Sequence, residues 1–453
     1  ASAALVLLAG LAGGALFAKD AVGGSGGDEA LRELIEEHTN VQIIDAKDVP
    51  PGGLGTGPEE ALSNIVPSAS TSEEVHWYCV DDDKLPPVKL VLKSDRVFER
   101  MLTQGGVGFG ESYMDGEWET DNLERMIWEM LKLTVLVEQR SLDLGWRALP
   151  LLGSLTWGAL KWKLFPNNSK TGAKENIENT YDTLDNPKLY EKMLGETMQY
   201  TCGYFYKPSM TLDEAEWAKI DLIATKLDLK PGMRVCEIGF GFGVTAHYLA
   251  SKYGVHVSGF TLSEDQRAWA MEHKSHPNIE YNICDYRDIE GKFDRIYSCG
   301  MFEHVGRNNY GAYFDKCYEL LNDDGIMLIH TMGSALRADW NHGSFINKYI
   351  FPGVELPRIS DLTQEYSDRW HLEDLHCFGK GYVQTCRGWL DNLRDWKGLE
   401  DTPASERRMW EYYLAAGAAA FERRRCQLWQ VVYTKLDSPR RDGCYHIRAP
   451  QEA

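Results

Sequence analysis

The sequence lacks the cysteine pairs and the positive charge that mark several protein classes. Its ten cysteines are scattered singly, with no CxxC spacing, so neither a structural zinc site nor a disulfide framework is expected. The thiols are therefore predicted to be reduced, in a reducing compartment. The 48 Lys and Arg residues stand against 68 Asp and Glu, giving a net charge of −20. Nucleic-acid binding needs a basic face, so this composition disfavours a general nucleic-acid binder.

Long apolar runs are also scarce. Residues 1–18, ASAALVLLAGLAGGALFA, carry no charge, but their Gly and Ala content makes a weak membrane span. A signal or transit segment is an alternative. We expect residues 1–27 to be an anchor that contacts lipid or a membrane-protein partner. A second apolar segment, residues 142–165, contains three tryptophans and ends in lysines, which fits a membrane interface and an interior helical hairpin equally well.

Composition also predicts the domain organisation. Residues 28–74 are rich in Gly, Pro and Ser and are predicted to be a linker with one short helix at EALRELIEEH. Residues 75–140 are expected to form a small lipid-facing α+β domain, followed by a Trp-rich connection over 141–173. Strand-like and helix-like stretches alternate in 174–453, which predicts an α/β domain with a mainly parallel sheet. Ligands of such sheets bind beyond the carboxyl ends of the strands.

The loop Glu237–Gly243 reads EIGFGFG after a strand-like run. It has neither the GK[ST] of a P-loop nor the GxGxxG spacing of dinucleotide sites, and a carboxylate at Glu237 would repel a pyrophosphate. Gly239 and Gly241 would let the backbone approach a ligand closely. We therefore expect S-adenosylmethionine, whose ammonium, sulfonium and ribose hydroxyls favour acceptor groups. A plain strand-to-helix turn is the alternative.

Two later stretches strengthen the cofactor interpretation. GFTLSEDQ is expected to place Leu262 and Gln266 near the ribose and adenine. CDYRDI follows the next strand and offers Asp285 to the adenine amino group, with Tyr286 packing on the ring. Each residue alone has an ordinary explanation as a helix cap or core aromatic. Together, at the ends of successive strands, they favour a cofactor site.

Several longer motifs carry a family resemblance. MQYTCGYF, GMFEHVG and LIHTMGS are specific as a set, and FERRRCQLWQVVYTK supports them. The chain resembles the cyclopropane-fatty-acyl-phospholipid synthases, within the lipid-modifying methyltransferases that include mycolic acid cyclopropane synthases. The resemblance runs from about residue 75 to the last predicted strand. It implies a Rossmann-like class I methyltransferase fold with a mainly parallel seven-stranded sheet, plus a smaller N-terminal α+β domain.

The resemblance also implies a reaction. Such enzymes transfer the sulfonium methyl group to a cis double bond of a phospholipid acyl chain, and a bound bicarbonate ion then removes a proton to close the ring. Carried over by position, the bicarbonate ligands are Cys202, Glu303, His330 and Tyr382, with the backbone of Met332. Tyr181 and Tyr200 are expected to help close the cofactor pocket. Aromatic faces stabilise a carbocation, and the candidates here are Tyr204, Phe205, Phe302 and Tyr382.

Alternatives remain open at this stage. The same fold and cofactor serve enzymes that make methyl-branched or methylene chains, or that methylate a small amine. A non-catalytic accessory subunit of a membrane complex is a third hypothesis. We expect a membrane phospholipid substrate, no nucleic-acid partner and no metal, and a homodimer remains open. The expected location is a membrane in a reducing compartment, either the bacterial cytoplasmic face or an organelle membrane.

Overall fold

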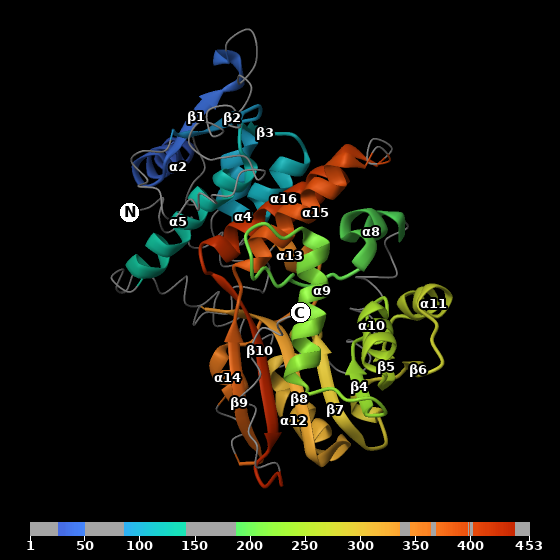
Figure 1. Cartoon of the computed structure of the whole chain (residues 1–453). Coiled ribbons are helices and arrows are strands. Elements are labelled where there is room, and N and C mark those ends of the chain that lie inside the picture. The colour runs from blue at the N-terminus through green and yellow to red at the C-terminus, as the bar shows by residue number, and fades with distance from the viewer. Residues whose placement is uncertain are drawn as a thin grey trace. The chain divides into compact units, whose positions relative to one another are not determined.

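The computed structural model describes residues 26–49, 86–141, 187–335, 345–363, 368–396, 398 and 402–439. The predicted anchor, except for residues 26 and 27, and the Trp-rich segment, except for residue 141, lie outside these residues. The chain divides into two compact units (Figure 1). The first comprises described residues within 1–165 together with 342–350 and 394–423, and the second comprises those within 166–341, 351–393 and 424–453. Among the described residues, no helix has the length and apolar character needed to cross a membrane.

The first unit is built on a three-stranded sheet. Strand β1 (Val41–Asp45) pairs in parallel with β2 (Val88–Leu92), and β3 (Trp118–Thr120) pairs antiparallel with β2. The helices of this unit are α2 (Gly26–His38), α4 (Arg96–Met114), α5 (Leu123–Ser141), α13 (Phe345–Tyr349) and α16 (Ala404–Glu422). A short 3-10 turn, η1 (Ala46–Asp48), follows β1.

Two parts of this unit depart from the expected boundaries. The segment 28–74, predicted to be a linker, contains the expected short helix but also strand β1, because Val41 and Ile43 are buried and pair with β2. Helix α16 lies within the predicted α/β domain of 174–453, yet it contacts α4 and α5 in the first unit. Its buried Trp410 and Tyr412 supply the apolar face that makes these contacts.

Trp118 stands at the centre of the first unit. Its side chain is fully buried and stacks on Phe109, with ring centroids 4.3 Å apart. The indole nitrogen donates to the Phe109 carbonyl at 3.1 Å and to the Ser112 hydroxyl at 3.0 Å. Arg408 of α16 donates to the Trp118 carbonyl at 3.0 Å. These contacts join β3, α4 and α16 around one core.

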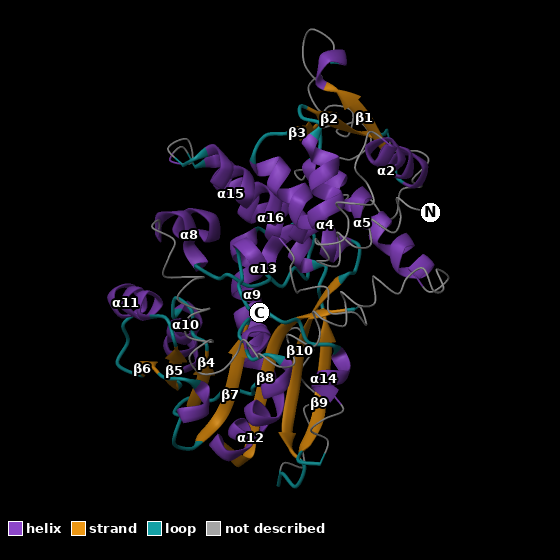
Figure 2. Cartoon of the chain, turned by 180° about the vertical axis from the view of Figure 1, so that it is seen from behind, coloured by secondary structure: helices purple, strands orange, loops and turns teal. Residues whose placement is uncertain are grey.

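The second unit carries the seven-stranded sheet that the sequence predicts. Its order is β6 (Ile279–Ile283), β5 (His256–Thr261), β4 (Arg234–Ile238), β7 (Phe293–Cys299), β8 (Leu321–Ser334), β10 (Cys426–Lys435) and β9 (Trp370–Cys377). Strand β10 runs antiparallel to both of its neighbours, and the other pairs are parallel. Figure 1 shows the strands side by side in this order, and Figure 2 shows them from behind. The expected mainly parallel sheet is confirmed.

Helices cover both faces of this sheet. The helices of this unit are α8 (Pro187–Leu194), α9 (Leu212–Lys226), α10 (Val244–Tyr253), α11 (Glu264–His273), α12 (Tyr310–Leu320), α14 (Ile359–Thr363) and α15 (Gly381–Asp395). Of these, α9 and α10 pack on one face of the sheet and α12 packs on the other. Alternate residues of β7 enter different cores: Ile296 packs with Phe314 of α12, whereas Tyr297 packs with Ile223 of α9. This alternation of apolar residues on both faces is typical of a buried parallel sheet.

Candidate cofactor and catalytic site

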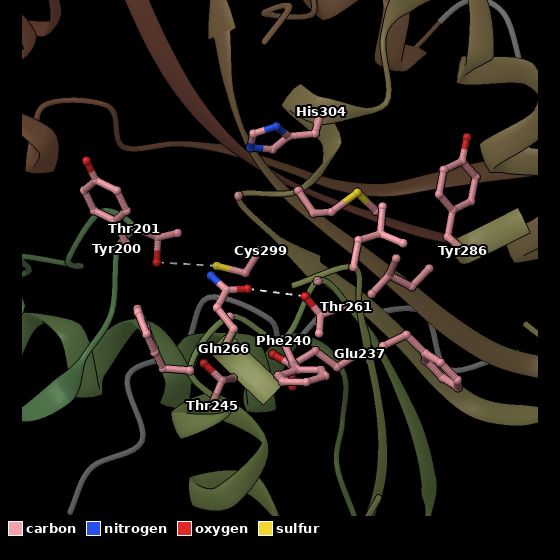
Figure 3. A pocket seen from close by; sticks show the side chains of 18 of the residues that line it. Tyr200, Thr201, Glu237, Phe240, Thr245, Thr261, Gln266, Tyr286, Cys299 and His304 are labelled. Atoms are coloured by element: carbon pink, nitrogen blue, oxygen red, sulfur yellow. Dashed lines mark hydrogen bonds between the residues drawn. The ribbon is translucent and has the colours of Figure 1, made fainter. Parts of the chain in front are cut away.

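A cleft of about 150 Å³ lies at the carboxyl ends of β4, β5, β6 and β7 (Figure 3). This is the edge at which ligands of open α/β sheets bind. Eight of the nine residues expected to contact the cofactor line it: Tyr200, Glu237, Gly239, Gly241, Leu262, Gln266, Asp285 and Tyr286. The ninth, Tyr181, lies outside the described residues.

The glycine loop has the shape that its sequence suggested. Gly239 and Gly243 have φ of 83° and 72°, a region that favours glycine. A Cβ atom at Gly239 would lie 2.8 Å from the Met301 side chain, and one at Gly243 would lie 2.7 Å from the Tyr281 hydroxyl. Side chains at either position would therefore distort the floor of the cleft. Gly241, with φ of 53°, has open space beside it.

Glu237 is the acidic group at the end of β4. It is 2% exposed, and its Oε2 atom has no hydrogen-bond partner among the described residues. Burial raises the pKa of this carboxyl to about 8. A cationic ligand in the cleft would favour the ionised form and satisfy the unpartnered oxygen. The carboxylate therefore suits a ligand that carries an ammonium or sulfonium group.

The opposite side of the cleft is held by a local ion pair. Asp285 accepts hydrogen bonds from the backbone NH of Arg287 at 3.0 Å and from its guanidinium at 2.7 Å. This pairing fixes the carboxylate beside Tyr286, and the sequence interpretation did not foresee it. On the neighbouring strand end, the Ser263 hydroxyl accepts from the Gln266 NH at 3.1 Å and caps α11. The cap positions the Gln266 side chain at the cleft.

Tyr200 stands in an aromatic group at the other end. Its ring centroid lies 5.6 Å from Tyr190, 5.5 Å from Phe351 and 5.2 Å from Trp389. These residues come from segments far apart in the sequence. The packing holds Tyr200 in place as part of the cleft wall.

The residues expected to bind bicarbonate do not line the cleft itself. Glu303 and His330 are 2% and 1% exposed. Glu303 Oε1 accepts from the Met332 backbone NH at 2.7 Å, so it is held against β8 beside His330. Burial raises the Glu303 pKa to about 7. Its Oε2 atom has no partner among the described residues.

His330 supplies a hydrogen-bond donor near the unpartnered acceptor oxygen of Glu303. Gln430 Nε2 lies 3.2 Å from Nδ1 of His330, so the amide donates to the ring and the neutral ring carries its proton on Nε2. That Nε2 atom is buried and unpartnered among the described residues. Burial lowers the His330 pKa well below its usual value, and the charges of Lys219 and Lys226 add to the effect. A buried donor and a buried acceptor thus stand beside the same strand, each lacking a partner.

Cys202 and Tyr382 form a second pair behind the cleft wall. Cys202 is fully buried, and burial raises its pKa well above the usual value, so it is a neutral thiol. A Cβ atom at Gly381 would lie 3.1 Å from the Cys202 sulfur, which places the start of α15, and hence Tyr382, next to it. This pair lies near the pair of Glu303 and His330. Cys299 is paired with His330 across strands β7 and β8, and its thiol lies 3.7 Å from the hydroxyl of Thr201, the residue that precedes Cys202.

One aromatic candidate occupies a different position from the one expected. Phe302 stacks on Tyr310, with ring centroids 4.5 Å apart, inside the core beneath α12. It does not line the cleft. Tyr204 packs edge-on against Phe378, and Phe378 in turn lies 5.8 Å from His330. Tyr204 is therefore close to the unpartnered groups and Phe302 is a core residue.

Sequence reasoning missed several residues of the cleft. Gln199, Thr201, Thr245, Cys299 and His304 all line it. Burial lowers the His304 pKa to about 4, which leaves a neutral imidazole at neutral pH. The motif MQYTCGYF contains the first two, but the residues selected from it were Tyr200, Cys202, Tyr204 and Phe205. The others carry no distinctive spacing in the sequence.

Comparisons with known proteins place this site in a family context. The family model described as mycolic acid cyclopropane synthetase matches residues 168–431. The cyclopropane-fatty-acyl-phospholipid synthase of Escherichia coli (strain K12) is 38% identical over 386 residues, which cover 81% of this chain and 97% of that protein. Tuberculostearic acid methyltransferase UfaA1 of Mycobacterium tuberculosis is 30% identical over 377 residues, which cover 79% of this chain and 85% of that protein.

A solved structure agrees with these matches. The crystal structure of mycolic acid cyclopropane synthase CmaA1 complexed with SAH and CTAB is similar to this chain, with a TM-score of 0.53 and 29% identity. The superposition covers 57% of this chain and 97% of that one.

Proposed function

Because the chain belongs to the mycolic acid cyclopropane synthetase family of S-adenosylmethionine-dependent methyltransferases, we propose that it adds a methylene group to a cis double bond of a phospholipid acyl chain, with bound bicarbonate as the base. The observation that carries the proposal is the cleft at the strand ends, which gathers eight residues predicted from the sequence as cofactor contacts. The related CmaA1 was crystallised with SAH.

The residues of the cleft fit S-adenosylmethionine. Glu237 offers a buried, unpartnered carboxylate oxygen to a cationic group. Gly239 and Gly241 have no side chains, so a ligand can approach their backbone closely. On the far side of the cleft, Asp285 offers a hydrogen-bond acceptor and Tyr286 offers the face of its ring. When bound, the sulfonium supplies an electrophilic methyl group. The contribution of the protein is to orient it and to keep water away from the reacting atoms.

The residues behind the cleft fit a small ion that both donates and accepts hydrogen bonds. Nε2 of His330 is a buried donor and Oε2 of Glu303 is a buried acceptor, and neither has a partner among the described residues. Bicarbonate has an anionic oxygen for the first and a hydroxyl for the second. Cys202, Tyr382 and the Met332 backbone would complete its binding. When bound, it would supply a base beside the acyl chain, held by these groups.

Glu303 has the pKa expected of a group that handles a proton near neutrality. Its value of about 7 means that it holds or releases a proton over the physiological range. The Met332 backbone NH fixes one oxygen at 2.7 Å and leaves the other to face the ion. We assign Glu303 to orienting and polarising the base. No covalent nucleophile is required, and Cys202 is a buried neutral thiol.

A methyl-branched product is the second candidate. The relative named tuberculostearic acid methyltransferase spans 79% of this chain, so the same fold and cofactor accompany a different lipid product. The substrate in both cases is lipid, which leads us to propose that the chain works at a membrane surface in a reducing compartment. Contact of residues 1–18 with lipid or a membrane protein, and a homodimer, remain predictions.

The test uses purified full-length chain, vesicles of cis-unsaturated phospholipid and S-adenosylmethionine, with lipid mass spectrometry. We expect lipid heavier by one methylene group, and a lower rate in bicarbonate-free buffer that recovers when bicarbonate is added. Replacing Glu303→Gln should lower turnover by roughly 10²-fold or more. Glu216→Gln is the matched control, because Glu216 is equally buried, lies outside the cleft lining and has a pKa raised well above its usual value.

Three results would each contradict a part of the proposal. Label appearing in a small amine with none in the lipid would remove the lipid substrate. Turnover of Glu303→Gln equal to that of Glu216→Gln would remove the assignment of Glu303, and a rate indifferent to bicarbonate would remove the base.

A further inference from the structure

Lys219 is a buried cation immediately behind the cleft wall. It lies on α9 and its side chain is fully buried. The ammonium donates to Gln199 Oε1 at 2.8 Å and to Thr201 Oγ1 at 2.6 Å, and both acceptors are neutral. Gln199 and Thr201 line the cleft. Burying a charge without an ionised partner is unfavourable by several kcal/mol, so the position calls for an explanation beyond packing.

The carboxylate nearest in sequence is hydrogen-bonded to a different group. Glu216 stands one turn earlier on α9 and is also fully buried. It accepts a hydrogen bond from the Thr197 hydroxyl, whereas the Lys219 ammonium donates to Gln199 and Thr201. Burial raises the Glu216 pKa well above its usual value and outweighs the charge of Lys219, which acts in the opposite direction. The positive charge of Lys219 is therefore directed toward the cleft side, through Gln199 and Thr201.

The Thr201 hydroxyl can donate a hydrogen bond into the cleft. An ammonium has no lone pair, so the Thr201 oxygen must accept from Lys219. It also accepts from the Cys299 thiol at 3.7 Å, whose pKa is raised to about 11 by burial. Both lone pairs of the Thr201 oxygen are then engaged. Its own hydroxyl proton has no acceptor among the described residues and remains available to a ligand.

The hydrogen bonds of Gln199 likewise determine how its amide is oriented. Its Oε1 atom accepts from Lys219 and from the Thr245 hydroxyl at 3.2 Å. The requirement that Lys219 meet an acceptor sets which atom of the amide is oxygen. The NH2 group is consequently on the other side of the amide, at the cleft that Gln199 lines. Two neutral donors, each polarised by one buried cation, thus border the same end of the cleft.

Two donors backed by a positive charge suit a carboxylate. Thr201 lies on the opposite side of the cleft from Tyr286, the residue expected at the adenine (Figure 3). Building on the proposed function, we propose that Lys219 is a positioning residue that orients Thr201 and Gln199 to donate to the carboxylate of the methionine end of the cofactor. Bicarbonate is the other oxyanion of the site, but its expected ligands lie outside the cleft lining, whereas this donor pair lies within it.

The test compares two probes that differ in the amino-acid end. S-Adenosylhomocysteine carries the carboxylate, and 5′-methylthioadenosine lacks it. Calorimetry should show that Lys219→Met weakens binding of S-adenosylhomocysteine by about 10- to 100-fold, the loss expected for hydrogen bonds to a charged group. Affinity for 5′-methylthioadenosine should stay within about twofold of wild type. Thr201→Val should shift the same ratio in the same direction, and it serves if Lys219→Met does not fold.

Lys226→Met is the matched control. Lys226 is on the same helix, is equally buried and bonds to Asp374 at 3.0 Å and His376 at 3.2 Å, which do not line the cleft. It should lower stability while leaving the ratio of the two affinities unchanged.

Three outcomes would each contradict a different assignment. Equal weakening of both probes by Lys219→Met would make its role purely structural and overturn the proposal. Unchanged S-adenosylhomocysteine binding, with an altered bicarbonate dependence of the rate, would overturn it in favour of the other oxyanion. Wild-type protein that binds neither probe would refute the cofactor assignment itself.

Discussion

Ionisation of Glu237 is expected to lower the stability of the ligand-free protein and to favour binding of a cationic ligand. The variant Glu237→Gln tests both effects. The carboxyl is 2% exposed and has a pKa of about 8 because of burial. In the unfolded chain its pKa would be the usual 4.5. Between these values the folded state keeps a proton that the unfolded state has released, so stability falls as pH rises through this window. Gln cannot ionise and lacks this pH dependence.

The magnitude follows from the two pKa values. Each pH unit between 4.5 and about 8 corresponds to roughly 1.4 kcal/mol, so Glu237 would destabilise the ligand-free protein by up to ~5 kcal/mol at pH 8. Relaxation and water entry reduce that upper limit. Glu237→Gln should therefore match wild type near pH 4.5 and become progressively more stable above it. The difference should level off beyond pH 8.

The assay is chemical denaturation of ligand-free wild type and Glu237→Gln at several pH values, read as the difference in unfolding free energy. Other titrating groups, Glu303 included, are common to both proteins and cancel. Saturating S-adenosylmethionine should reverse the order, because only the carboxylate attracts the cationic ligand. Parallel pH profiles for the two proteins would refute the reasoning, as would equal S-adenosylmethionine affinities.

Further predictions concern the rate, the glycine loop and a helix cap. At fixed bicarbonate and saturating S-adenosylmethionine, kcat/KM for the lipid should rise with pH and level off above about 7 as Glu303 ionises, and Glu303→Gln should abolish the rise in a pH–rate profile. Thermal denaturation should show Gly241→Ala costing about 1–2 kcal/mol for its left-handed backbone, with Gly239→Ala worse because its Cβ meets Met301 at 2.8 Å; equal losses would contradict this. Thr211→Ala should cost about 1 kcal/mol in denaturant titrations because it removes the α9 capping box, and no change would contradict that cap.

Local patterns were sufficient for the regular parts of the fold. Among the helix-like stretches of residues 174–453, VTAHYLASKY forms α10 and EDQRAWAMEH forms α11. Strand β9 was missed because only Trp370 of its eight residues is buried, which gives an edge strand little apolar pattern. Strand β1 was missed because it is short and stands beside Gly- and Pro-rich sequence. Its pairing with β2 spans more than forty residues, which local sequence cannot reveal.

The site was predictable where it follows the strand ends. Glycines and acids at those ends define a cleft edge in any parallel sheet, so Glu237 and Asp285 could be selected directly. Lys219 was missed although a signal existed: it stands four residues after Ala215 and four before Ile223, both fully buried. A lysine at that phase of a helix is a core position. The partnership with Gln199 and Thr201 depends on tertiary contacts that sequence alone does not supply.

Transfer from a donor whose methyl group carries three deuterium atoms tests the central claim most directly. Wild-type chain is incubated with cis-unsaturated phospholipid vesicles, and the lipid is analysed by mass spectrometry and proton NMR. Methylene addition predicts that two deuterium atoms enter each modified chain, the third leaves with the base, and the double bond becomes a ring. Lipid that keeps all three deuterium atoms, or lipid with none beside a labelled small molecule, would contradict the account.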